Sequence, residues 1–175
     1  TIKDAISWCD YIDLLRFFGK DLHNAKYVCP TNLKAEHDRY VELKRKYYRK
    51  QREQERIREA MRHEQQYRDA KGRFFGIDLT DGKIHVRVLE SIEQFRQEGE
   101  AMHHCVFTNE YYRRDDSLIL SATMDGKRLE TVEVSLSRLK VAQSRGVCNE
   151  DSPYHKQIIK LVQHNIHLIE NRLTA

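Results

Sequence analysis

Two histidines stand directly before a cysteine in the sequence, at His103, His104 and Cys105. A thiolate is a nucleophile and a metal ligand, and a nearby imidazole can activate a thiol as a general base. The three residues follow a segment with helical apolar spacing and precede Tyr111 and Tyr112, which are close enough in sequence to form the wall of a pocket. The triplet therefore indicates a reactive centre, a metal site, a ligand-binding site or a part of the core.

In the first hypothesis Cys105 is a catalytic nucleophile. The thiolate would need a positive field from a helix N-terminus or an imidazolium, and an amide such as Gln143 or Asn149 would stabilise an oxyanion. Adjacent residues on a regular backbone point in different directions, so the histidine next to the cysteine is not assured as the base. Three histidines remain candidates for that role: His103, His104 and His155.

A zinc site would combine the triplet with Cys148 as a further ligand. Zinc ligands usually come in pairs two to four residues apart, and the four cysteines, at positions 9, 29, 105 and 148, form no such pair. In the core hypothesis Cys105 and Val106 are buried, and His104 donates a hydrogen bond to a buried carbonyl or to Glu133. Binding of a small ligand is the remaining hypothesis, and no pattern predicts a cofactor.

The segments around the triplet favour short antiparallel strands. Two β-prone runs, RFFGIDL and IHVRVL, flank an Asp-Gly turn, and a second hairpin joins SLILSATM to RLETVEVSL through DGK. RLKVAQSRG predicts a third strand beside the second hairpin. Ser91 is typical of an N-cap for the helix IEQFRQEGEAM, which leads directly into the triplet.

The strands determine where further polar residues point. In TVEV, Thr131 and Glu133 point to one face and the two valines to the other. Gln143 is expected on the Val141 face of its own strand, at the end where Gly146 turns the chain. The end of the Gln143 strand, the turn at Gly146 and the end of the helix before the triplet can lie next to one another in the fold. We therefore predict one pocket that holds His104, Cys105, Glu133, Gln143 and Asn149.

The N-terminal part of the chain has helical patterns. Apolar residues from Ile2 to Leu15 repeat every three or four positions, Gly19 is typical of a C-cap, and KYVCPTNL indicates an extended link. A long charged helix is predicted without a break over 33–70, and a closing helix over 154–173. Three aromatic residues of the first helix are expected in the core: Trp8, Phe17 and Phe18.

These elements define an α+β fold. It is an antiparallel sheet of two hairpins plus a third strand, packed with helices on one side and preceded by a helical N-terminal arm with a long charged helix. We place the arm at residues 1–72 and the α+β core at residues 73–175, because the composition changes at Gly72. A length of 175 residues is enough for one sizeable core plus such an arm.

Positive charge is concentrated in the arm. Between Lys34 and Arg73 the chain has 14 Lys or Arg against 8 Asp or Glu, whereas the whole chain has a net charge of +4. A basic helix of this kind can bind nucleic acid, although mixed charge on a helix is more often only a solvated surface. Three tyrosines among the basic residues are packing residues or stack on single-stranded bases: Tyr40, Tyr47 and Tyr48.

The composition also indicates a compartment. No apolar run approaches the ~18 residues that span a bilayer, and the cysteines are not spaced like a disulfide scaffold. These features predict a soluble, cytoplasmic protein without a membrane partner. The first residue is not methionine, so we expect the chain to be part of a longer protein.

Three short motifs carry a family resemblance: HHCV, TVEV and QSRGVCN. Together with DYIDLLRFFGKDL and CPTNLKAEHD they resemble the PcfJ-like family, whose hallmark is a His-Cys-Val motif, and the resemblance covers most of the chain. The family motifs correspond to these residues: His104, Cys105, Val106, Glu133, Gln143, Gly146 and Asn149. The resemblance also implies an arginine at the end of the first strand of the second hairpin. This chain has SATM there, so no charge-dependent role is expected at that point.

The resemblance implies an accessory protein of a mobile element, which is a conjugative plasmid, an integrated element or a phage, and it names no reaction. It also implies protein partners from the same conjugation or phage system. The functional hypothesis is a module that binds nucleic acid or a small ligand at the predicted pocket. A cysteine-dependent acyl transferase or hydrolase using Cys105 is the alternative, so the sequence leaves open whether the protein is an enzyme.

Overall fold

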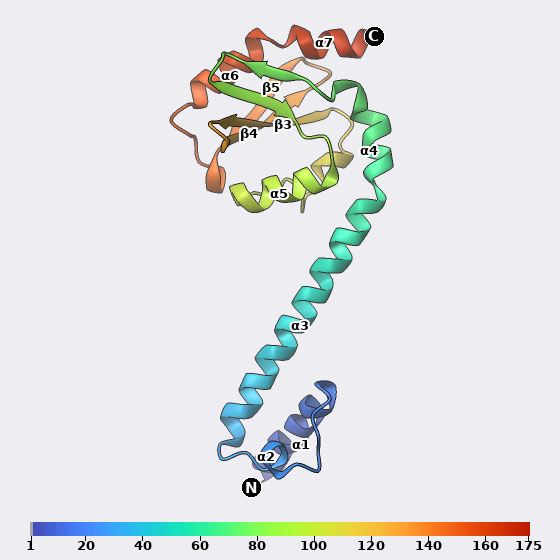
Figure 1. Cartoon of the computed structure of the whole chain (residues 1–175), viewed down its shortest axis with the longest axis vertical. Coiled ribbons are helices and arrows are strands. Elements are labelled where there is room, and N and C mark those ends of the chain that lie inside the picture. The colour runs from blue at the N-terminus through green and yellow to red at the C-terminus, as the bar shows by residue number, and fades with distance from the viewer. Residues whose placement is uncertain (1) are drawn as a thin grey trace. The chain divides into compact units, whose positions relative to one another are not determined.

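Two compact units divide the chain, Thr1–Arg58 and Glu59–Ala175. The computed structural model describes residues 2–175, with side chains from residue 5 onward (Figure 1). The division falls before the predicted boundary at Gly72, because the segment ahead of the sheet packs with the second unit. In that segment Tyr67 and Lys71 are buried, and they donate hydrogen bonds to backbone carbonyls of the second unit.

The first unit is built from helices. Helix α1 spans Ile2–Phe17, α2 spans Ala25–Val28, and α3 begins at Leu33. Gly19 follows α1 in the left-handed region at φ +60°, as predicted for a C-cap. A small core joins the helices and contains Tyr11, Ile12, Leu14, Leu15 and Tyr40.

The predicted extended link KYVCPTNL is wrong in its first three residues, because α2 covers them. Asn24 caps this short helix by accepting a hydrogen bond from the Lys26 amide at 3.0 Å. At the end of the link, Asn32 accepts a hydrogen bond from the Ala35 amide at 3.0 Å and starts α3. Local side-chain caps therefore decide both helix starts.

The predicted burial of Trp8 and Phe17 is also wrong. Trp8 is 44% and Phe17 38% exposed, and the buried stripe of α1 begins only at Tyr11. The Trp8 indole nevertheless donates a hydrogen bond to the Val28 carbonyl at 3.0 Å. The apolar position predicted at Ile2 lies outside the side chains that the structure describes.

The long charged helix is interrupted, which corrects the prediction of one helix over 33–70. Helix α3 ends at Arg62, His63 forms a turn, and α4 spans Glu64–Lys71. His63 has φ −87° and ψ 0°, so the helical hydrogen-bond ladder shifts at this residue. The shift lets α4 present Tyr67 edge-on to Phe95, with ring centroids 5.3 Å apart.

The second unit contains an antiparallel sheet, five-stranded within the described residues, in the order β1-β2-β3-β4-β5. Both predicted hairpins and the third strand are confirmed. Asp125 and Gly126, at φ 50° and 74°, form the turn of the second hairpin with the positive φ pair that such turns favour. The first β-prone run differs in part, because residues 73–74 belong to a short 3₁₀ helix, a turn follows, and the strand begins only at Asp78. The strands are Asp78–Thr80, Ile84–Val88, Ser117–Met124, Lys127–Ser135 and Lys140–Arg145, and the 3₁₀ helices are Gly72–Phe74, Tyr111–Arg113 and Val147–Asn149.

Helices cover both faces of the sheet, which corrects the expectation of helices on one side (Figure 1). Helices α6 (His155–His164) and α7 (His167–Thr174) bury Ile158, Val162 and Ile169 in the main core on one face. Helix α5 (Ile92–Met102) lies on the other face, where its buried Glu98 accepts hydrogen bonds from two strands. The predicted closing helix is therefore two helices, separated at residues 165–166.

Candidate functional site

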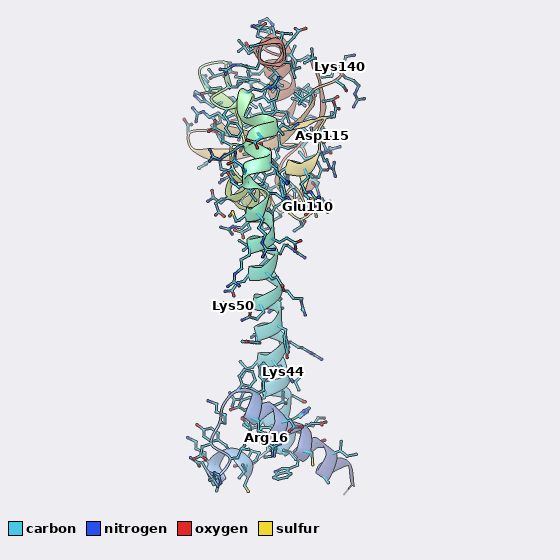
Figure 2. The ribbon with its side chains drawn as sticks, turned by 90° about the vertical axis from the view of Figure 1, so that its right-hand side faces the viewer. Arg16, Lys44, Lys50, Glu110, Asp115 and Lys140 are labelled. Atoms are coloured by element: carbon cyan, nitrogen blue, oxygen red, sulfur yellow. The ribbon has the colours of Figure 1, made fainter. Side chains whose placement is uncertain are left out.

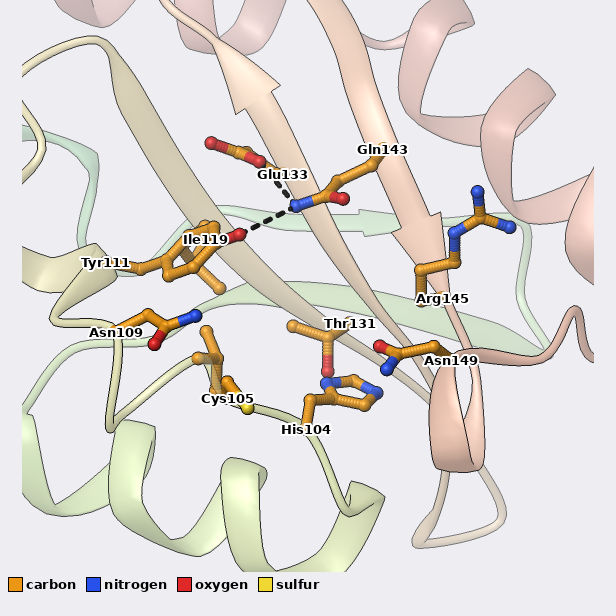
Figure 3. A pocket seen from close by; sticks show the side chains of 11 residues that line it. His104, Cys105, Asn109, Tyr111, Ile119, Thr131, Glu133, Gln143, Arg145 and Asn149 are labelled. Atoms are coloured by element: carbon orange, nitrogen blue, oxygen red, sulfur yellow. Dashed lines mark hydrogen bonds between the residues drawn. The ribbon is translucent and has the colours of Figure 1, made fainter.

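One pocket on the α5 face brings the five predicted residues together (Figure 3). It has a volume of about 270 Å³ and lies between the end of α5, strands β3 to β5 and the loop after β5. This is a small volume for a ligand pocket. The polar residues of its wall are His104, Cys105, Asn109, Tyr111, Thr131, Glu133, Gln143, Arg145 and Asn149.

The end of α5 decides where the HHCV motif points. His103 takes the left-handed conformation at φ 54°, and the amides of both His103 and His104 donate to the Gly99 carbonyl. The chain after the helix passes close to Gly99, and a Cβ at this position would lie only 3.2 Å from the His104 carbonyl oxygen. The absence of a side chain at Gly99 therefore allows this close approach. His103 is therefore an exposed helix cap outside the pocket, and the chain after it enters the pocket wall.

His104 is fixed by the loop after β5. Its Nε2 lies 2.9 Å from the Gly146 carbonyl oxygen, which can only accept, so Nε2 carries the proton in this contact. The Nδ1 atom is then left as an acceptor in the neutral ring. Gly146 has no room for a side chain, since a Cβ would lie 2.7 Å from the Glu150 carbonyl oxygen.

Glu133 and Gln143 form a paired group on adjacent strands. Gln143 Nε2 donates to Glu133 Oε2 at 2.7 Å and lies 3.2 Å from the Tyr111 hydroxyl (Figure 3). The other carboxylate oxygen of Glu133 accepts a hydrogen bond from the Ser117 hydroxyl. Each carboxylate oxygen of Glu133 therefore accepts one hydrogen bond, from Ser117 and from Gln143.

A β-bulge places Gln143 on the pocket face, which corrects its predicted position. Glu133 pairs with Gln143 and Val134 with Val141, so Ala142 has no partner in the β4 ladder. Val141 packs against the main core while Gln143 lines the pocket on the opposite face. The sequence-based prediction assumed a regular strand, in which Val141 and Gln143 share a face, and it therefore missed the extra residue Ala142.

A buried carboxylate supports the pocket from behind. Glu98 is fully buried and accepts hydrogen bonds from Thr131 at 2.7 Å, Ser121 at 2.9 Å and the Arg128 guanidinium at 2.8 Å. Thr131 itself lines the pocket, so this group ties α5 to the pocket wall. One sequence signal could have indicated it, because Glu98 interrupts the apolar spacing between Phe95 and the end of α5.

A second buried carboxylate holds the loop that carries Asn149. Glu130 accepts hydrogen bonds from the Ser152 amide at 2.9 Å, from the Ser144 hydroxyl and from His155 Nδ1 at 2.9 Å. Burial raises the pKa of Glu130, but these hydrogen bonds outweigh burial and hold the pKa below its ordinary value. His155 therefore bonds to Glu130 and does not line the pocket. It is no longer a candidate for the general base that would activate Cys105.

Backbone strain accompanies that loop. Cys148 and Asn149 have φ 56° and 64°, in the left-handed region that residues other than glycine rarely adopt. The two strained residues lie within the 3₁₀ helix that projects Asn149 into the pocket wall. Strain at a ligand-facing loop is a common feature of functional sites.

The core hypothesis fits Val106 and His104 but not Cys105. Val106 is buried and His104 binds a backbone carbonyl, whereas Cys105 is exposed, as are Cys9, Cys29 and Cys148. The zinc hypothesis finds no support, because in the described part of the chain no group of three or more potential ligands is placed to hold a metal.

The fold and the site define an α+β protein with a polar pocket between a helix end and one face of the sheet. The chain belongs to the PcfJ-like protein family, because the model of that family matches residues 7–159. No curated protein and no solved structure matches the chain significantly. Among the described residues no helix has both the length and the apolar character to cross a membrane.

Proposed function

We propose that the α+β unit binds a small polar ligand in the pocket that contains His104 and Cys105. The observation that carries this proposal is the set of polar groups left without an internal partner. Among the described residues, the side chains of Cys105, Asn109 and Asn149 make no hydrogen bond, although all three line the pocket. All three side chains are exposed, so their polar groups are free to contact a ligand that enters the pocket.

The charges of the wall indicate a ligand that is not an anion. Glu133 is held by Ser117 and Gln143, and Arg145 forms an ion pair with Asp151 at 2.9 Å. The groups bonded to Glu133 are neutral, so the wall keeps one carboxylate charge without an ion-pair partner among the described residues, and this charge disfavours an anion. The two asparagine amides offer both donors and acceptors, which complement a carboxamide, a nucleobase or a similar heterocycle.

A panel of neutral amides, free nucleobases and zwitterionic amino acids tests the proposal by thermal shift. A ligand at 100 times its dissociation constant adds about 2.7 kcal/mol of stability, which raises the melting temperature by several degrees. We expect the same compound to protect Cys105, but not Cys9 or Cys29, from iodoacetamide. The variant Asn149→Ala should lose both effects, and the exposed Asn171→Ala is the matched control. Protection of all cysteines alike, or of none, would contradict the proposal.

The family membership supports a wider role for this module. The resemblance of the HHCV, TVEV and QSRGVCN motifs implies proteins of conjugative plasmids, integrated elements and phages. In this proposal the module is an accessory part of such an element and works with protein partners of the same transfer or phage system. Co-purification of the tagged chain from cells that carry the element, with and without the other transfer genes, tests the association.

A cysteine-dependent acyl transferase or hydrolase is the second candidate. It is favoured by the exposure of Cys105 in the pocket and by the Gly146 contact, which leaves Nδ1 of His104 as an acceptor. In this case the Cys105 sulfur attacks the carbonyl carbon of an ester or amide, the leaving group departs with a proton, and water or another acceptor takes the acyl group. No hydrogen bond joins Cys105 to an imidazole among the described residues, so the ligand-binding proposal is preferred.

The pH dependence of alkylation distinguishes the two candidates. An activated Cys105 should react with iodoacetamide at pH 6 to 7 much faster than Cys9 or Cys29, and His104→Ala should shift that profile towards the ordinary value of about 8.5. Mass spectrometry of each cysteine peptide gives the four rates separately. Equal rates at all four sites, unchanged in His104→Ala, would reject the enzyme.

A further inference from the structure

Three aromatic rings form an exposed surface on the first unit. Phe17 from α1 and Tyr47 and Tyr48 from α3 are 38%, 45% and 45% exposed. Their ring centroids lie 5.2 Å, 5.6 Å and 5.7 Å apart, so each ring is held in place by the other two. We call these three residues the aromatic surface. Large apolar groups gathered on a surface usually mark a place where a partner binds.

The aromatic surface lies within the most basic run of the chain. Residues 44–52 of α3 contain six Lys or Arg and no Asp or Glu, along about 12 Å of helix. Lys44 Nζ lies 4.9 Å from the centre of the Phe17 ring, and Figure 2 shows Lys44 and Lys50 along α3. We call residues 44–52 the basic run.

Most cations of the basic run have no internal partner. Outside the run, Arg39 pairs with Glu36 at 2.7 Å and Arg56 with Glu53 at 3.8 Å. Within the run the one ion pair among the described side chains is a loose contact of Arg45 with Glu42 at 3.9 Å. Four cations there remain unpaired and exposed: Lys46, Arg49, Lys50 and Arg52.

We infer that the aromatic surface and the basic run bind single-stranded nucleic acid. Unpaired cations attract phosphates, and exposed rings held edge-on can stack on bases whose faces are free. A duplex satisfies only the first requirement, because its bases are already stacked. Acidic peptides and anionic lipids have negative charge but no bases. The inference concerns only residues of the first unit and does not depend on the pocket of the second.

Fluorescence anisotropy with the full chain and a labelled oligothymidine tests the inference, with inorganic polyphosphate of similar charge as the competitor. Wild type should bind the oligonucleotide at least ten-fold more tightly than polyphosphate, because stacking adds to the charge term. Tyr47→Leu with Tyr48→Leu should remove this preference, and Tyr47→Phe with Tyr48→Phe should retain it. Equal affinity for both polyanions in wild type would overturn the inference.

The salt dependence tests the basic run separately. On single strands each neutralised phosphate contributes about 0.7 to the slope of log affinity against log salt. Replacing Lys46, Arg49 and Lys50 with Gln should therefore lower the slope by about 2. The matched control replaces three cations of the same helix outside the run, Lys34, Arg56 and Arg58, and should change the slope by less than 1. Equal effects of the two triple variants would show general attraction by the helix and reject the assigned site.

A covalent readout keeps the inference testable if a leucine variant does not fold. Oligonucleotides that carry 5-iodouracil form photo-crosslinks to aromatic side chains in contact with the base. We expect crosslinked peptides that contain Tyr47, Tyr48 or Phe17 in the wild-type protein. Crosslinks confined to the second unit, or a stronger binding of duplex or anionic vesicles than of the single strand, would contradict the inference.

Discussion

Three consecutive residues of the HHCV motif have three different structural roles. His103 ends α5 in the left-handed conformation, His104 donates to the Gly146 carbonyl, and Cys105 is exposed in the pocket wall. The backbone turn, rather than the side-chain types alone, separates these roles. The contact between His104 and Gly146 joins two motifs that lie more than forty positions apart in the chain.

We predict that Gly146→Ala destabilises the second unit by about 1 to 3 kcal/mol. The new Cβ would lie 2.7 Å from the Glu150 carbonyl oxygen and 3.2 Å from that of Leu129, and both are backbone atoms that cannot move easily. Urea unfolding measures the loss. Gly72→Ala is the control, because a Cβ there meets nothing within 4 Å and its φ of −56° suits any residue. An equal loss in both variants would contradict the steric explanation.

The five pocket residues could be predicted because they stand in recognisable motifs, but their supports could not. Glu98 and Thr131 reveal their roles only when α5 crosses the sheet, a contact between residues 33 positions apart. The core hypothesis is wrong for Cys105, because the chain enters the pocket wall after the helix cap at His103 and leaves this side chain exposed. A histidine in the left-handed conformation gives no signal in the sequence.

Pairs of elements in the second unit are joined by buried carboxylates. Glu98 connects α5 to strands β3 and β4, and Glu130 connects β4 to β5 and the start of α6. Helix and strand positions were predictable from apolar periodicity, whereas the break at His63 and the bulge at Ala142 were not. Both irregularities follow from tertiary packing, which local patterns do not record.

Loss of the guanidinium next to Glu98 should loosen α5. We predict that Arg128→Ala costs about 2 kcal/mol, below the ~3–5 kcal/mol of a fully buried pair, because the Arg128 side chain is partly exposed. Chemical denaturation of the second unit measures the change. Arg113→Ala breaks an exposed pair with Glu110 and should cost less than about 0.5 kcal/mol. A similar cost for both would argue against a special role for Glu98.

Acid should weaken the loop that carries Asn149. The lowered pKa of Glu130 means that its contribution to stability is fully present above the ordinary Glu pKa of about 4.3 and is lost as pH falls through the lower folded value. We predict that the urea midpoint of wild type falls more steeply below pH 4.5 than that of Glu130→Gln. The exposed Glu170→Gln should follow wild type. Parallel curves for wild type and Glu130→Gln would contradict this linkage.

Charge is divided unevenly between the two units of the molecule. Residues 1–58 have 14 Lys or Arg against 9 Asp or Glu, whereas residues 59–175 have 17 against 18. Each unit has its own buried cluster. The uneven charge could be predicted from the sequence, but the assignment of α4 to the second unit depends on contacts made by Tyr67 and Lys71.

We predict that residues 59–175 fold without the first unit. Their core and both buried carboxylate groups are complete within this range. Circular dichroism should show one cooperative thermal transition, and any thermal-shift compound found with the full chain should act on the fragment as well. A broad, non-cooperative transition would show that the first unit contributes to this core.

The extra residue in β5 has a consequence for changes in chain length. Val141 and Gln143 point to opposite faces because Ala142 stands outside the ladder. In a regular strand that lacks Ala142, the same two residues would still pair with Val134 and Glu133. Deleting Ala142 should thus preserve which side chains enter the pocket. Loss of a single codon at this position is therefore a more conservative change than most substitutions in the pocket wall.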